Sequence, residues 1–331
     1  MSVSDGPTVS LITPFYNTAE HLEKCIRSVL AQTYSNFEYV LLDNCSTDGS
    51  SEIAQKFARS DSRIRLVQPD EFVDQIPNYN RALQQISSDS RYCKLVQADD
   101  WIYSRCLEEM VNIIGRNPQV GIVSSYRLKG TDVRHQGLPP DRSVIDGREA
   151  ARRHLLGDFF LFGSPTSLLF RSDIVRDRIP FYEVTSPHAD TEACYEILAD
   201  WDMAFVHQVL TFSRVREDSI LSQQEVYDPH HLLDRFLVVH QYADHYLREG
   251  EAARIRDVVD RAYYGFLARE VLSRPGEEFW KYHRANLATA DMDIRWGYLV
   301  QHLARVFADI ALNPLNTARR LIGRLETAGA S

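Results

Sequence analysis

Short apolar runs alternate with amphipathic stretches along the first 127 residues of the chain. The apolar runs predict buried strands, and apolar residues spaced three or four apart predict helices. Strands are expected at 9–13, 37–42, 64–67, 92–96 and 120–126, with helices at 19–32, 48–58, 78–86 and 104–114. This alternation predicts βαβ units, and therefore an α/β protein with a mostly parallel sheet flanked by helices.

The pattern changes twice after this region. Residues 128–146 are polar and are expected to form a loop. Two further strands and two helices are then expected, at 167–170, 204–211, 148–156 and 190–198. From residue 228 the pattern is helical to the end, including a last helix at 318–327. We therefore expect three parts, at 1–127, 128–227 and 228–331.

The composition is that of a globular protein with a sizeable core. The chain has 331 residues, of which 44% are hydrophobic and 25% charged, which excludes collagen, coiled-coil rods and disordered chains. The net charge of −9 argues against nucleic acid as a partner, because phosphate binding needs a surplus of basic side chains. Five cysteines without a C-x-x-C pair indicate neither a disulfide framework nor a zinc site. No secretory signal or membrane-spanning run is recognisable, and we expect a cytoplasmic protein.

Polar and aromatic residues follow three of the expected strands. Tyr16 follows the first strand and could stack on a planar base, or could be a core aromatic. Asp43 follows the second and could accept a hydrogen bond from a base N–H or a ribose hydroxyl. Because ligands of parallel sheets bind beyond the carboxyl ends of the strands, these loops are the place to look for a site.

Two adjacent acids, Asp99 and Asp100, follow the fourth strand. Neighbouring carboxylates repel each other unless a cation compensates them. A hard divalent ion shared with a diphosphate is one solution, since Mg²⁺ favours carboxylate and phosphate oxygens. A solvated turn with a helix cap is the alternative, and the position at the sheet edge favours the functional interpretation.

The three loops together resemble the family 2 glycosyltransferases of the GT-A fold. The motifs that carry the resemblance are Pro-x-Tyr-Asn from Pro14, Asp-x-x-Ser-Thr-Asp-Gly from Asp43, and Ala-Asp-Asp from Ala98. The resemblance is strong over residues 8–127, weaker to about 222, and absent beyond. It implies a nucleotide-sugar-binding half at 1–127, an acceptor-binding half at 128–227 and a helical C-terminal extension at 228–331.

The resemblance also implies roles for the donor-site residues. Pro14 and Tyr16 would line the nucleobase pocket, and Asp43 would bind the base edge. Arg81 lies where relatives often carry an arginine near the diphosphate, although a solvated helix residue is equally compatible with its position. Asp99 would face the ribose or the sugar.

Asp100 would bind a divalent cation, Mn²⁺ or Mg²⁺, which bridges the donor diphosphate. The chain departs from the family pattern at two positions nearby. Asn44 and Gln97 stand where many relatives carry acids. Asp99 and Asp100 remain, so the expected metal site is retained, while the choice of nucleotide becomes less defined.

The catalytic base of the family is an acid in a Glu-Asp pair that opens a helix in the acceptor half. Here the first acid is replaced by Ala189, and Asp190 occupies the second place. An acceptor hydroxyl needs a base to take its proton as it attacks. Asp190 is the expected base, with Glu192 as the fallback, although an acid at this position could also only cap the helix.

The resemblance thus implies an inverting hexosyltransferase of polysaccharide biosynthesis. It would move a sugar from a nucleoside-diphosphate donor, expected to be a UDP-sugar, to a hydroxyl of a glycan, a lipid-linked glycan or a glycoprotein. The alternative is a catalytically inactive nucleotide-sugar-binding or scaffold protein of the same fold, which Asn44, Gln97 and Ala189 favour. A glycosidase using Asp100 and Asp190 is a further reading, which the diphosphate-type loop argues against.

The sequence allows several roles for the helical extension. It could pack on the catalytic part, form a homodimer, or rest on the inner face of a membrane. The basic segment 319–324 favours peripheral membrane contact, whereas the net charge of −9 weakens it.

Overall fold

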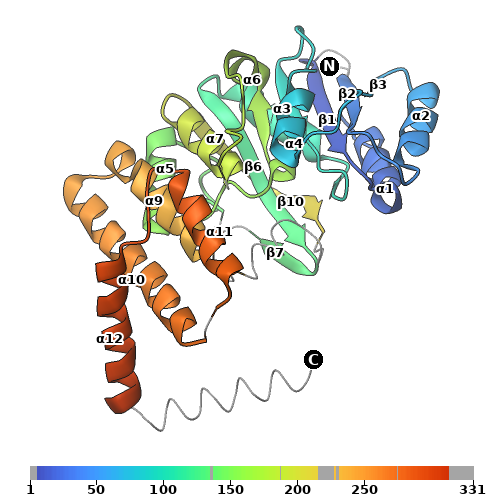
Figure 1. Ribbon diagram of the computed structural model, residues 1–331. Coiled ribbons are helices and arrows are strands. Elements are labelled where there is room, and N and C mark those ends of the chain that lie inside the picture. The colour runs from blue at the N-terminus through green and yellow to red at the C-terminus, as the bar shows by residue number, and fades with distance from the viewer. Residues whose placement is uncertain are drawn as a thin grey trace. The chain divides into compact units, whose positions relative to one another are not determined.

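The computed structural model describes residues 6–134, 137–186, 188–214, 227–228, 231–273 and 275–312. The chain divides into two compact units, Met1–Glu217 and Asp218–Ser331. The first unit holds the sheet, and the second unit is helical in its described part (Figure 1).

One mixed sheet organises the first unit. Its order is β3-β2-β1-β4-β9-β6-β10-β5, with β7 paired to β6 and β8 paired to β10. The strands of the described chain are β1 (Val9–Phe15), β2 (Phe37–Asp43), β3 (Ile64–Val67), β4 (Tyr92–Leu95), β5 (Trp101–Ile102), β6 (Val120–Lys129), β7 (Asp132–Arg134), β8 (Val144–Ile145), β9 (Leu169–Arg171) and β10 (Asp202–Ser213).

The predicted parallel arrangement is confirmed for the long strands. β1 lies between β2 and β4 and is parallel to both, β3 is parallel to β2, and β10 is parallel to β6. β9 runs antiparallel between β4 and β6 and joins the two parallel groups into one sheet. Because β6 crosses residue 127, the two halves expected from the sequence share this sheet.

The stretch 128–146, expected to be a loop, contains β7 and β8 and the end of β6. These short strands escape a hydrophobic-pattern prediction for a physical reason. β7 is exposed along its whole length, and β8 has only two residues, so neither shows the apolar alternation of a buried strand.

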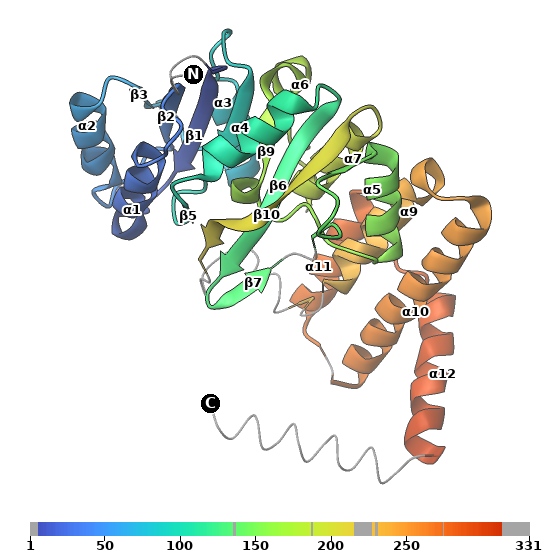
Figure 2. The ribbon, with the colours of Figure 1, turned by 180° about the vertical axis from the view of Figure 1, so that it is seen from behind.

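Seven helices are described in the first unit, and they cover both faces of the sheet. Figure 2 shows α1 and α4 in front of the sheet, whereas α3 and α7 lie in front of it in the opposite view of Figure 1. Their bounds are α1 (Ala19–Leu30), α2 (Ser50–Ser60), α3 (Gln75–Leu83), α4 (Cys106–Arg116), α5 (Gly147–Leu156), α6 (Ser172–Asp177) and α7 (Ala189–Leu198).

The helix expected at 78–86 begins three residues earlier than predicted. Pro77 lies inside the first turn of α3, and the amide of Asn78 donates to Asp74 O at 2.9 Å. Proline is tolerated in a first turn because the amides there have no partner within the helix. The sequence prediction used Pro77 as the helix boundary, and for this reason it gave a start that is too late in the chain.

The second unit confirms the predicted helical pattern as far as it is described. It contains α9 (Leu232–Tyr246), α10 (Glu249–Ser273), α11 (Glu277–Ala288) and α12 (Trp296–Leu312). His283 is fully buried in this unit and hydrogen-bonds Tyr263 at 3.0 Å, and burial lowers its pKa to about 4. The helix expected at 318–327 lies outside the described residues. Among the described helices, none combines the length and the apolar character that crossing a membrane requires.

A close backbone approach fixes the start of α5. A Cβ atom on Gly147 would lie 2.0 Å from Trp201 O and 2.6 Å from Leu198 O. We expect Gly147→Ala to lower the free energy of unfolding of the first unit by about 2–3 kcal/mol, because backbone atoms cannot yield as a flexible side chain can. Gly115→Ala in α4 is the matched control.

The nearest atom to a Cβ on Gly115 is the Tyr92 hydroxyl oxygen at 3.9 Å, an ordinary contact. The control substitution should therefore leave stability unchanged or raise it by up to about 1 kcal/mol. Urea denaturation followed by circular dichroism measures both variants. A Gly147→Ala protein as stable as the wild type would contradict the close approach.

Candidate functional site

The carboxyl ends of β1, β2 and β4 meet at one edge of the sheet. Phe15 lies opposite Asp43 in the β1–β2 register, and the amide of Asn44 donates to Phe15 O at 2.8 Å. On the other side of β1, the amide of Val96 donates to Ile12 O at 2.8 Å. The three loops singled out in the sequence therefore emerge side by side, as predicted.

Side chains join the first two of these loops to each other. The amide of Asn17 donates to the Ser46 hydroxyl at 3.1 Å, and the Thr47 amide donates to Asn17 Oδ1 at 2.8 Å. Asp48 accepts from the Ala19 amide at 2.9 Å, so it ties the second loop to the first turn of α1. Asn17 adopts a positive φ of 48°, which asparagine tolerates better than most residues. The loops 16–19 and 44–50 thus form one connected structure, which we call the loop pair.

Tyr16 stands on the loop pair with 45% of its surface exposed. Its ring lies 4.7 Å, centroid to centroid, from Phe72, which is 49% exposed. Two accessible aromatic rings at a strand end offer a stacking surface for a planar group. The loop that carries Phe72 is held by Asn44, whose amide nitrogen donates to Val73 O at 2.7 Å and whose oxygen accepts from the Val73 amide at 3.2 Å.

Two other residues that the sequence predicts for the nucleotide site, Arg81 and Pro14, contact other parts of the protein. The Arg81 guanidinium donates to Glu71 O at 2.8 Å, so Arg81 also anchors the loop that carries Phe72. Pro14 is buried within β1, opposite Leu42. Whether either residue contacts a nucleotide stays a prediction.

Asp43 is 2% exposed and accepts hydrogen bonds from its own loop and its neighbours. The donors are the Ser46 amide at 2.9 Å, the Gln68 amide nitrogen at 3.4 Å and the Ser51 hydroxyl. A carboxylate has about four acceptor positions. These three bonds leave about one position for a ligand, so Asp43 shapes its loop whatever else it binds.

Asp100 is the second buried acid of this edge. It is 4% exposed, and its Oδ2 accepts from the Thr166 hydroxyl at 2.7 Å and from the Ser213 hydroxyl at 3.4 Å. Its Oδ1 accepts from the Arg214 amide at 3.0 Å. The half-buried Asp99 presents its carbonyl oxygen to Arg214 Nε at 3.3 Å. Two segments far along the sequence, at Thr166 and at Ser213 and Arg214, thus converge on the Asp99–Asp100 turn.

The charge of Asp100 is poorly compensated. Burial, and after it the charge of Asp99, raises the pKa of Asp100 from 3.8 to about 7, although the Thr166 and Arg214 hydrogen bonds oppose the shift. A cation at this turn would relieve that penalty, so the acid pair fits a divalent ion. In the described part of the chain no three His, Cys, Asp or Glu side chains cluster as a metal site. Such an ion would therefore need phosphate or water oxygens beside the carboxylates.

Asp190 lies at the start of α7 and is half-buried. Its Oδ1 accepts from the amide of Thr191 at 2.7 Å. The charges of Asp100 and Asp190 both act on the guanidinium of Arg127, whose pKa burial lowers, and the Nε of Arg127 has no hydrogen-bond partner. Arg127 therefore links the two acids electrostatically, although 90 positions separate them in the sequence.

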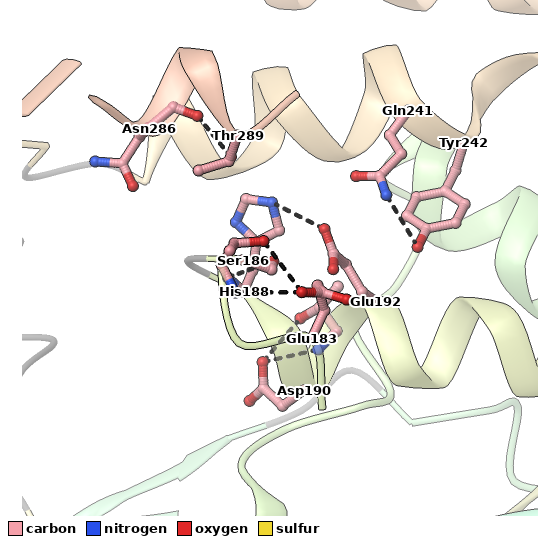
Figure 3. A network of polar contacts seen from close by, with 11 residues as sticks. Glu183, Ser186, His188, Asp190, Glu192, Gln241, Tyr242, Asn286 and Thr289 are labelled. Atoms are coloured by element: carbon pink, nitrogen blue, oxygen red, sulfur yellow. Dashed lines mark hydrogen bonds and ion pairs between the residues drawn. The ribbon is translucent and has the colours of Figure 1, made fainter. Parts of the chain in front are cut away.

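Glu192, the fallback base, lies in a different environment from Asp190. It is 6% exposed, and its carboxylate lies 3.9 Å from Nε2 of His188 one helical turn earlier. In Figure 3 the Asp190 carboxylate points away from this His188–Glu192 pair. Asp190 and Glu192 thus lie on one helix but face different surroundings.

The sequence interpretation missed three residues at this edge. Arg127 stands at the end of a strand, where it looks like a solvated terminus. Phe72 is an aromatic residue among the acids of a loop, and this unusual setting was the only feature of the sequence that could have identified it. Thr166 belongs to a Gly-Ser-Pro-Thr stretch that predicts no more than a turn, whereas its hydroxyl donates to Asp100.

A family model described as Glycosyl transferase family 2 matches residues 10–179, which include all of the loops described above. The chain belongs to this family. Among relatives, TuaG of Bacillus subtilis (strain 168), named for teichuronic acid biosynthesis, is 30% identical over 138 residues, 42% of this chain and 52% of TuaG. The glycosyltransferase GlyG of Streptococcus pneumoniae serotype 4 is 27% identical over 118 residues, 36% of this chain and 38% of GlyG. The chain thus matches about half or less of these relatives.

Two solved structures share the fold of this chain at low sequence identity. TarS residues 1–349 of S. aureus, solved with UDP-GlcNAc, gives a TM-score of 0.56 at 16% identity and covers 78% of this chain and 73% of its own. The mannosyltransferase PcManGT of Pyrobaculum calidifontis, solved with GDP-Man and Mn²⁺, gives 0.53 at 16% identity over 93% and 89%. The GT-A fold expected from the loop motifs is therefore confirmed.

The raised pKa of Asp100 gives the metal-free family 2 protein a distinct pH dependence. The folded carboxyl loses its proton near pH 7, whereas in the unfolded chain it is already ionised above about pH 4. Stability falls with rising pH wherever the folded state binds more protons.

Between pH 5 and pH 8 we expect the wild type to lose about 2–3 kcal/mol more unfolding free energy than Asp100→Asn, which cannot ionise. Urea denaturation in EDTA at the two pH values measures this difference. Identical pH dependences of the two proteins would contradict the buried, uncompensated state of Asp100.

Proposed function

We propose that this family 2 protein transfers one sugar from a nucleoside diphosphate to a hydroxyl group, with inversion at the anomeric carbon. The observation that carries the proposal is that the charges of Asp100 and Asp190 both act on a single guanidinium, that of Arg127. One acid suits the cation of the donor diphosphate, and the other suits the acceptor hydroxyl. Holding both reactants in one site supplies the proximity that a single displacement needs.

The donor would bind along the edge formed by β1, β2 and β4. Its base would stack on Tyr16 and Phe72, beside Pro14, while Asp43 offers its remaining acceptor position to a base N–H. Asp99, half-buried beside Asp100, would face the ribose or the sugar. UDP is the proposed carrier, which agrees with the UDP-GlcNAc of the TarS structure, while the GDP-Man of PcManGT names the competing base.

The diphosphate would lie over the Asp99–Asp100 turn. A divalent cation, Mn²⁺ or Mg²⁺, held by Asp100 would supply charge neutralisation for the leaving diphosphate. The Mn²⁺ of the PcManGT structure supports this choice of cofactor. Arg127 and Arg214 add positive charge at the same turn, and Arg81 is proposed to bind the nucleotide near the diphosphate.

Asp190 would act as the base. As the acceptor oxygen forms its bond to the anomeric carbon, Asp190 takes the hydroxyl proton, and the bond from that carbon to the diphosphate oxygen breaks. The products are the glycosylated acceptor and a nucleoside diphosphate. The buried His188–Glu192 pair leaves Asp190 as the acid of this helix suited to the role.

The acceptor is proposed to be a hydroxyl of a growing polysaccharide. This rests on relatives such as TuaG, which is named for teichuronic acid biosynthesis. Its binding residues are proposed to come from 128–227, the part that the sequence assigns to the acceptor.

Nucleotide binding tests the donor site. We expect calorimetric titration with UDP, GDP and dTDP to show tight binding of one nucleotide, UDP, only when Mn²⁺ is present. Asp100→Ala should weaken this metal-dependent binding at least tenfold, because it removes a charged ligand. Glu71→Ala, which removes an exposed acid of a neighbouring loop, is the control and should bind normally. A folded wild type that binds none of the three nucleotides would overturn the proposal.

Turnover tests the base. We expect Asp190→Asn to lower the release of nucleoside diphosphate by about 100-fold or more, the usual effect of losing a general base. The Kd for the nucleotide with Mn²⁺ should change less than about threefold, since Asp190 does not hold the donor.

Glu192→Gln is the control for Asp190→Asn, because it makes the same chemical change two residues along the helix and should keep most of the turnover. The opposite result for the two variants would move the base to Glu192. A wild type that binds nucleotide with metal but never releases nucleoside diphosphate, with or without added acceptors, would identify a binding protein instead of an enzyme.

A further inference from the structure

A lysine lies fully buried in the middle of the sheet. Lys94 belongs to β4, pairs with Leu11 of β1 and is 0% exposed. Its Nζ donates to Thr166 O at 2.5 Å and to Leu168 O at 3.1 Å, and it lies 3.8 Å from Met110 Sδ. Each N–H of an ammonium thus has one acceptor, and none of these acceptors is a carboxylate.

Burying an ammonium whose hydrogen-bond acceptors are not carboxylates is expensive, and burial lowers the pKa of Lys94, although the charge of Asp100 opposes this shift. An apolar side chain would suit the centre of a parallel sheet better. What the lysine provides is a partner for two buried carbonyls of the turn 164–168. Thr166 and Leu168 lie where the short helix η2 (Pro165–Ser167) passes into β9, and β9 pairs only from Leu169 onward.

The same turn reaches Asp100 through the side chain of Thr166. The Thr166 hydroxyl donates to Asp100 Oδ2 at 2.7 Å and accepts from the Gln97 amide at 3.1 Å. Lys94 therefore holds the backbone of the residue whose hydroxyl orients the acid. Four hydrogen bonds join the segment 94–100 to the turn 164–168, and two of them come from the ammonium.

We propose that Lys94 is a positioning residue for the diphosphate end of the donor site. It acts through Thr166, whose hydroxyl sets the orientation in which Asp100 meets a divalent cation. This inference rests on the proposed function, because it takes Asp100 as the ligand of that cation. Lys94 itself touches neither substrate nor metal.

The test is the Mn²⁺ concentration that gives half-maximal UDP binding, measured by calorimetry. Lys94→Met keeps the length of the side chain and removes its donors. We expect this variant to need about tenfold more Mn²⁺, the effect of losing one well-placed hydrogen bond of about 1.4 kcal/mol. The affinity for UDP at saturating Mn²⁺ should change less than twofold, which a general loss of structure would not allow.

A double-mutant cycle separates action through Thr166 from a direct effect. Thr166→Val removes the hydroxyl and should cause a shift similar to that of Lys94→Met, whereas Thr166→Ser should restore most of the Mn²⁺ affinity. In the Thr166→Val background, Lys94→Met should add no further shift. Additive shifts would overturn the inference.

Leu95→Ala is the control for lost stability. Leu95 is the next residue of β4, is 1% exposed, and its truncation should destabilise the protein without changing the Mn²⁺ requirement. If Lys94→Met does not fold, Lys94→Gln keeps N–H donors on a shorter neutral side chain and should shift the Mn²⁺ requirement about threefold. An unchanged requirement in a folded Lys94 variant overturns the inference alone, whereas a wild type without Mn²⁺-dependent binding overturns the proposed function as well.

Discussion

A buried carboxylate must receive hydrogen bonds or lie near a positive charge. This requirement organises the edge of the sheet at which β1, β2 and β4 end. Asp100 draws in the Thr166 hydroxyl, the Ser213 hydroxyl and the Arg214 amide. These partners lie 66, 113 and 114 positions away in the sequence. Meeting the needs of one acid therefore brings the turn before β9 and the end of β10 to the strand end of β4.

The position of one arginine meets the same need of buried acids for a compensating charge. The charges of Asp100 and Asp190 both act on the guanidinium of Arg127, which belongs to β6, a strand whose first residues are buried. A strand of the sheet thus carries the electrostatic link between the Asp99–Asp100 turn and the start of helix α7.

The parts of this site that a sequence reveals are those made within one loop. Tyr16, Asp43 and Asp100 each stand directly after an apolar strand, and the strand pattern alone predicts that parallel strands present such residues at one edge. Lys94 and Arg127 give no such signal, because their meaning depends on segments that fold against them from far along the chain. Lys94 even contradicts the local pattern, since a charged residue in a central strand is acceptable only when backbone carbonyls from elsewhere surround it.

The loop pair has a consequence for how a ligand is received. Asn17, Ser46 and Asp48 tie two loops into one body while the protein folds. Ordering a flexible residue costs about 1–2 kcal/mol of free energy. Because the loop pair is already ordered by these hydrogen bonds, binding of a ligand does not include that cost. A planar group that bound beside Tyr16 would meet a loop surface that does not rearrange. Selection among planar ligands would then depend on whether the shape of the ring fits this surface.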